Sequence, residues 1–102
     1  MRDKLVSVRE AAAGVASGHR VVMSATLQRP PMAVLREIVR RRLTDLRLIG
    51  VTTGDINFDF LVGAGAARVI DTCAVTLGEF ARSGPNFARR VMAGQVRALD
   101  NT

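Results

Sequence analysis

Four side chains that could bind an anion lie within six residues of each other. Ser24 and Thr26 supply hydroxyls, Gln28 supplies an amide and Arg29 supplies a fixed positive charge. They follow an apolar run of strand length and precede the start of a predicted helix. Hydroxyls, backbone N–H groups and a helix dipole together suit phosphate or a polarised carbonyl oxygen. The alternative is that these are ordinary turn and capping residues, since Ser and Thr favour such positions without any ligand.

A second polar group, Thr52-Thr53-Gly54, ends the next strand-like run. The two threonines could bind the same ligand as the first group if both groups lie at one edge of a sheet. Gly54 has two interpretations. It could allow a substrate to approach the backbone closely, or it could only permit a turn with positive φ.

Few residues are suited to covalent or acid–base chemistry. Glu79 is the one glutamate outside a predicted helix, and a carboxylate there could act as a base or nucleophile, although a solvated loop residue is the stronger interpretation. His19 precedes a strand and has no Cys or Ser motif beside it, which favours a surface or turn position. Cys73 lies in an apolar run, where a free thiol usually behaves as a small buried hydrophobe.

Metal, disulfide and dinucleotide sites are not expected. The chain has one Cys and one His, too few for a structural zinc site or an internal disulfide, and this cysteine usage fits a reducing compartment. Gly63-Ala64-Gly65 follows a helix pattern and lacks the third glycine of a dinucleotide fingerprint. No signal peptide and no membrane-spanning run are apparent, so we expect a cytoplasmic protein.

Helix and strand patterns alternate along the chain. Predicted helices cover 7–17, the segment from Pro30-Pro31 to Leu43, 55–65 and 84–94, and predicted strands cover 20–25, 46–53, 69–75 and 96–99. Such alternation with short connections predicts an α/β fold with an open, mainly parallel sheet and crossover helices on both faces. No repeat or linker divides the 102 residues, so we expect one domain, 1–102.

The predicted helices have identifiable inner faces and ends. Ser7 and Glu10 form a capping-box pattern at the start of the first helix, and Gly18 is expected to end it. In the second helix, Glu37 is expected to pair with Arg41 at a spacing of four. The last helix is expected to turn three apolar residues inward: Phe87, Val91 and Met92.

Positive charge is in excess, with 15 Lys and Arg against 9 Asp and Glu, a net charge of +6. The arginines could contact nucleic acid, but the chain has no Tyr or Trp for base stacking, so nucleic-acid binding is the least favoured function. A solvated basic face is the default interpretation. Docking of the arginines against an acidic partner or an anionic ligand is the second interpretation.

The order of these pieces is similar to the N-terminal part of the A subunit of two-subunit family I CoA-transferases, especially the glutaconate CoA-transferase type. The resemblance covers nearly the whole chain, and its most specific parts are the run from Leu61 to Ile70 and the segment Gly84-Pro85-Asn86-Phe87. Further matching segments are Lys4 to Ala13, Gly18 to Val22, Arg29 to Met32 and Thr44 to Ile49.

The resemblance implies a function, a substrate and a partner. Such enzymes move coenzyme A between carboxylic acids through a glutamyl-CoA thioester, and a B-type subunit usually supplies the nucleophilic glutamate. Coenzyme A or acyl-CoA would be a substrate, with no permanently bound cofactor and no catalytic residue in this chain. The substrate-binding residues would be those of the two loops: Ser24, Ala25, Thr26, Gln28, Arg29, Thr52, Thr53 and Gly54.

The chain departs from the family pattern in two ways. The usual glycines after the first strand are replaced by Ser24, Ala25 and Thr26, which narrows the space for an acyl group. Family A subunits also have roughly 200 residues or more, as expected of a complete doubly wound domain. The alternative function is therefore a non-catalytic α/β module for oligomerisation or anion binding. In either case, a half-sheet with open edges predicts an oligomer.

Overall fold

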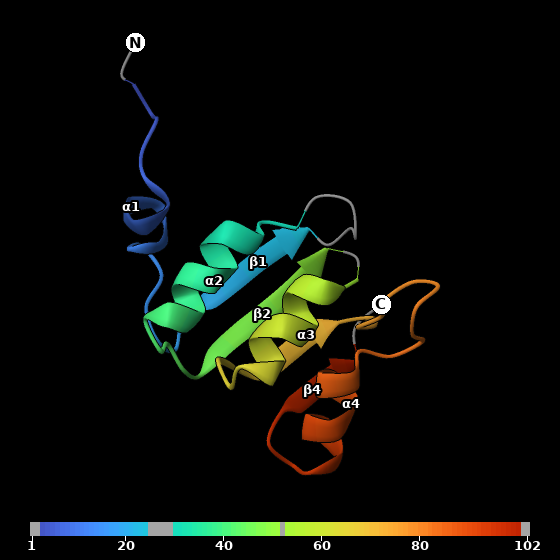
Figure 1. The fold of residues 1–102 in the computed structure, drawn as a ribbon. Coiled ribbons are helices and arrows are strands. Elements are labelled where there is room, and N and C mark those ends of the chain that lie inside the picture. Colours follow the sequence, from blue (N-terminus) through green and yellow to red (C-terminus); the bar gives the residue numbers. More distant parts are fainter. Residues whose placement is uncertain (1–2, 25–29, 52, 101–102) are drawn as a thin grey trace.

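The computed structural model describes residues 3–24, 30–51 and 53–100. Helices and strands alternate along the chain as the sequence predicts (Figure 1). The elements are α1 (Val8–Ala12), β1 (Arg20–Ser24), α2 (Met32–Arg40), β2 (Leu46–Val51), α3 (Ile56–Gly63), β3 (Ala67–Thr72), α4 (Pro85–Met92) and β4 (Arg97–Asp100).

The four strands form one sheet in the order β1-β2-β3-β4, and every neighbouring pair is parallel. The predicted open parallel sheet is thus confirmed. Ser24, at the end of β1, lies opposite Val51, at the end of β2. The carboxyl ends of these strands therefore lie at one edge, where we expected the two polar groups to meet.

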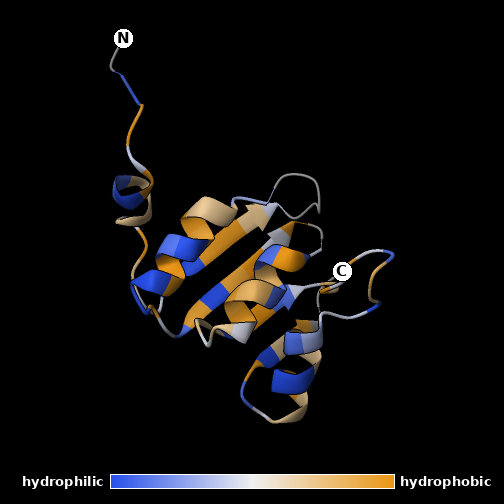
Figure 2. Ribbon diagram, viewed as in Figure 1, coloured by the Kyte–Doolittle hydropathy of each residue, from blue (hydrophilic) through white to orange (hydrophobic). Residues whose placement is uncertain are grey.

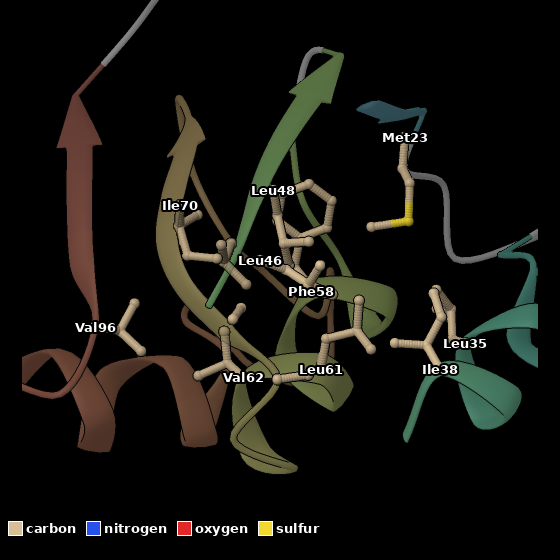
Figure 3. Packing of buried hydrophobic residues seen from close by; sticks show 13 residues of the cluster. Met23, Leu35, Ile38, Leu46, Leu48, Phe58, Leu61, Val62, Ile70 and Val96 are labelled. Carbon is tan, nitrogen blue, oxygen red and sulfur yellow. The ribbon is translucent and has the colours of Figure 1, made fainter. Parts of the chain in front are cut away.

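Helices α2, α3 and α4 all cover the same face of the sheet (Figures 1 and 3). The expectation of helices on both faces is therefore wrong for the described residues. The reason is topological. Each strand adds on the same side of the preceding one, and a right-handed crossover then places every connecting helix on the same face. Cover on both faces requires the strand order to reverse, and no reversal occurs among these four strands.

The core lies between the sheet and the three helices (Figure 3). Strand residues Met23, Leu48 and Ile70 contact the layer formed by Leu35 and Ile38 of α2 and by residues of α3. Helix α3 is at the centre: Phe58, Leu61 and Val62 are fully buried. Helix α4 is more hydrophilic than α2 and α3, and it buries no residue fully (Figure 2). In the described part of the chain, no helix is long and apolar enough to cross a membrane.

The first two helices differ from the sequence prediction in their ends and ion pairs. Ser7 caps α1 by accepting from the Glu10 N–H, but α1 ends after Ala12, and Gly18 (φ +83°) instead forms the turn before β1. Glu37 is buried and pairs with Arg40, not with Arg41. The Arg41 guanidinium instead donates to the backbone carbonyl of Val15 at 2.9 Å, which ties the segment after α1 to α2.

A buried carboxylate of α3 caps the next helix. The Asp59 Oδ1 atom accepts from the Phe87 backbone N–H at 2.8 Å, and its Oδ2 atom accepts from the Asn86 side-chain amide at 3.0 Å. The capping position of α4 itself is Gly84, and a Cβ there would clash with Asp59 Oδ1. Asp59 thus supplies the acceptor that the first turn of a helix needs and that Gly84 lacks.

The inner face of α4 is narrower than predicted. Phe87 and Val91 pack against the core, but Met92 is 89% exposed. Phe87 and Val91 are four residues apart and share one side of the helix, whereas each further residue turns by about 100°. Met92 therefore points to solvent.

Candidate functional site

The candidate site is the carboxyl edge of the sheet, where the loops after β1, β2 and β3 begin. Of the eight residues predicted to bind substrate, the structure describes Ser24, Thr53 and Gly54. Ser24 is exposed and Thr53 is half-buried. The remaining five, Ala25, Thr26, Gln28, Arg29 and Thr52, lie outside the described residues.

The loops after β2 and β3 continue the parallel pairing beyond the strands. Gly54 forms a parallel bridge with Val75. Its N–H donates to the carbonyl of Ala74 at 2.8 Å, and its carbonyl accepts from the Thr76 N–H at 3.0 Å. These bonds hold the two loops side by side, so the edge next to Thr53 has a fixed backbone.

Position 54 requires glycine because a side chain there would clash with the core residue Phe58. It is buried, and a Cβ at this position would lie 2.5 Å from Cδ2 of Phe58. Its φ does not lie in the left-handed region, which the described glycines occupy at Gly18, Gly65, Gly78 and Gly94. The turn interpretation is therefore wrong. The close approach that Gly54 permits in this structure is the approach of the Phe58 ring.

Two buried polar residues, Asp55 and Asn57, organise the start of α3 at this edge. Asp55 precedes the helix, as predicted for a cap, but its side chain makes no capping hydrogen bond. Asn57 has that role: its Oδ1 accepts from the Phe58 N–H at 2.9 Å and from the Asp55 N–H at 3.1 Å. Sequence reasoning missed Asn57, because an Asn inside a helix pattern carries no sign of a bond back to the preceding loop.

The Asp55 carboxyl belongs to a residue that is 8% exposed. Desolvation by burial raises the pKa of this carboxyl above its ordinary value of 3.8. The charged form is thus disfavoured in the folded chain, so the stability that Asp55 contributes is greatest at low pH and falls as pH rises through the raised pKa. A carboxyl of this kind beside Thr53 can donate a hydrogen bond when protonated and accept when ionised.

A cavity of about 160 Å³ lies farther along the same edge, between β3, β4 and α4. Ile70, Thr72, Cys73 and Ala98 line it together with Phe87 of α4. The prediction that Cys73 is a buried strand residue is wrong. β3 ends at Thr72, and Cys73 is exposed in the loop that follows. Ligand sites commonly measure about 300–1,000 Å³, so this cavity would hold only a fragment such as a short acyl chain.

The remaining chemical candidates lie elsewhere. Glu79 is an exposed loop residue. The His19 Nδ1 atom accepts from the Ala16 N–H at 3.2 Å in the turn before β1. Within the described ranges, no group of three or more His, Cys, Asp and Glu side chains could hold a metal ion. The edge thus presents hydroxyl, backbone and carboxyl groups, which are the types of group that hydrogen-bond a polar ligand.

The parallel sheet with its crossover helices is a CoA-transferase-like fold, and solved structures bear out the resemblance carried by the sequence. Glutaconate coenzyme A-transferase from Acidaminococcus fermentans matches over 98% of this chain with a TM-score of 0.84 and 25% identity. The decarboxylase AibA/AibB, solved as a variant, matches over 95% with a TM-score of 0.80 and 24% identity.

This chain spans about a third of each solved chain, 32% of the glutaconate enzyme and 38% of the decarboxylase. No family model matches the sequence, and no curated protein matches it. The fold is thus shown by structure, and the activity is a separate inference.

Proposed function

We propose that the chain acts as the A-type component of a CoA-transferase-like enzyme and that a B-type subunit supplies the nucleophilic glutamate. The observation that carries this proposal is the match to glutaconate coenzyme A-transferase over 98% of the chain. The alternating order of helices and strands and the shared edge at the carboxyl ends of the parallel strands support it.

The reaction would proceed by covalent catalysis on the partner. The glutamate carboxylate attacks the thioester carbonyl of the donor acyl-CoA, and the CoA thiolate leaves. The thiolate then attacks the glutamyl carbonyl of the resulting anhydride, which forms a glutamyl-CoA thioester and releases the donor acid. The acceptor acid takes up coenzyme A by the same two steps in reverse.

This chain would supply binding groups for that reaction. Negative charge develops on the carbonyl oxygen at each attack, and fixed hydrogen-bond donors stabilise it. The Ser24 and Thr53 hydroxyls are the described donors at the edge, and the paired loops at Gly54 fix the backbone beside Thr53. The small cavity at Cys73 would receive part of the acyl group.

The strand order supports the involvement of a second component. In open α/β sheets, ligands bind at the carboxyl edge where the strand order reverses, because two loops diverge there and leave a crevice. The order β1-β2-β3-β4 contains no such reversal. The described residues therefore form one wall of a crevice, and a second component would supply the opposite wall.

The alternative is a non-catalytic α/β module that binds an anion or assembles with other subunits. It is favoured by the residue types Ser24, Ala25 and Thr26, which stand where the resemblance implies glycines. Ligand binding at the edge separates the two functions, because a purely structural module has no reason to recognise an acyl-CoA.

Titration with acyl-CoA, followed by nuclear magnetic resonance of the backbone amides, tests the proposal. We expect saturable shifts at Ser24, Thr53 and Asp55, and about fivefold weaker binding in Thr53→Val, since one lost hydrogen bond is worth about 1 kcal/mol. The control Thr44→Val removes an exposed hydroxyl before β2, at the opposite edge, and should leave the affinity unchanged. No saturable shift, or equal affinity in both variants, would contradict the proposal.

A further inference from the structure

The face of the sheet opposite the helices carries an ordered pattern of side chains, called here the open face. The register places them in rows across the strands. The first row contains Arg20, Arg47, Val69 and Arg97. The second row contains Val22, Ile49, Asp71 and Leu99, and Ser24 and Val51 begin a third.

Among the described residues, none of the three crossover helices covers the apolar part of the open face. Val22 is 62% exposed and Val51 is 57% exposed, although both lie within strands of the sheet. Parallel sheets occur almost only with both faces covered, because their crossovers place helices on the faces. The three crossover helices here all lie on the opposite face (Figure 1). The open face therefore carries apolar residues of the kind that are normally buried, but these residues are exposed.

The charges on this face are unbalanced. The Arg47 guanidinium pairs with Asp71 at 2.7 Å, which uses the acidic side chain of the second row. Arg20 and Arg97 are exposed at opposite ends of the first row, and no ion pair involves them among the described residues. The first row thus presents surplus positive charge beside the second row, which is apolar except for the paired Asp71.

We propose that the open face docks an α-helical element of a partner chain, with an apolar stripe over Val22, Ile49 and Leu99 and acidic side chains opposite Arg20 and Arg97. The row from Val22 to Leu99 crosses three strand spacings of about 4.8 Å, about 14 Å in all, which about nine residues of one helix span at 1.5 Å per residue. The inference rests on the proposed function in taking the occupant to be a partner chain, and it names the surface that receives it.

Charge argues against a second copy of this chain as the occupant. Two open faces placed against each other would bring four unpaired arginines, two from each copy, into one interface. Both copies also carry a net charge of +6. Like charges held together in this way oppose association, whereas opposite charges favour it.

Binding of two designed peptides to the isotope-labelled protein tests the proposal. Both peptides are helical, about 18 residues long, and carry the same leucine stripe with spacings of three and four residues. One has Glu beside the stripe and the other has Lys. We expect the Glu peptide to bind at least about tenfold more tightly, equivalent to about 1.4 kcal/mol, and to shift the methyl signals of Val22, Ile49 and Leu99.

The double variant Arg20→Glu/Arg97→Glu should reverse this preference. The control Arg36→Glu/Arg82→Glu makes the same change of charge at exposed residues of α2 and the loop before α4, and it should retain the wild-type preference. Circular dichroism establishes that each variant is folded. A third variant, Val22→Asp, replaces an apolar residue of the second row by a charged one and should weaken the binding of both peptides.

Equal binding of the two peptides, shifts outside the open face, or the same preference in both double variants would overturn the proposal. A dimer in sedimentation equilibrium that Val22→Asp dissociates would also overturn it, because a second copy would then occupy the face. These outcomes are distinguishable from failure of the proposed function, since the peptide assay contains no coenzyme A and the acyl-CoA titration contains no peptide.

Discussion

The variant Phe58→Ala is expected to lose about 3–5 kcal/mol of unfolding free energy, the range for removing a buried aromatic side chain. Phe58 is fully buried at the centre of the core, between the sheet and α3. Its ring also fills the space that Gly54 leaves open. The cavity left by alanine would thus reach the backbone that pairs the loops after β2 and β3. Urea unfolding followed by circular dichroism measures the loss.

Phe80→Ala is the matched control for this change. Phe80 is 87% exposed in the loop after β3, so the same atoms are removed without creating a cavity. We expect its effect to remain within about 0.5 kcal/mol, as for most surface substitutions. Similar losses in the two variants would mean that Phe58 does not pack as described.

The variant Asp59→Ala is expected to lose about 3 kcal/mol, because it removes two hydrogen bonds to a buried carboxylate, each worth about 1.5–3 kcal/mol. Both bonds connect α3 to the first turn of α4. Without them, the Phe87 N–H and the Asn86 amide lose their acceptor. Loss of structure should therefore begin at α4 and β4, which hydrogen exchange of their amides can detect.

Asp3→Ala and Asp59→Asn separate this role from a general effect of charge. Asp3 is exposed and accepts one local bond, from the Leu5 N–H at 2.9 Å, so its removal should have little effect. Asparagine at position 59 keeps one oxygen for the Phe87 N–H but turns its amide toward that of Asn86, so an intermediate loss is expected. A larger loss in Asp3→Ala than in Asp59→Ala would contradict the capping role.

The order and type of the elements could be predicted because they depend on local patterns. Apolar runs of strand length, the capping box at Ser7 and the prolines before α2 are each set by residues close in sequence. Parallel pairing then follows from the alternation of helices and strands. The meeting of Ser24 and the residues after β2 at one edge follows in turn from parallel pairing.

The features that were missed depend on distant partners. One-sided cover of the sheet depends on the direction in which each strand adds, which no local pattern contains. Asp59 and Asn57 appear in sequence as polar residues within an apolar helix, and their bonds to α4 and to the loop before α3 exist only in the folded chain. The exposure of Cys73 depends on where β3 stops pairing with β4.

The most direct test of the central claim is coenzyme A transfer from succinyl-CoA to a panel of carboxylic acids, measured for this chain with and without a B-type CoA-transferase subunit. The proposed function predicts turnover only when both are present, with a glutamyl-CoA thioester trapped on the B-type subunit and slower turnover in Thr53→Val. Turnover by the B-type subunit alone, or none in any combination of folded proteins, would contradict it.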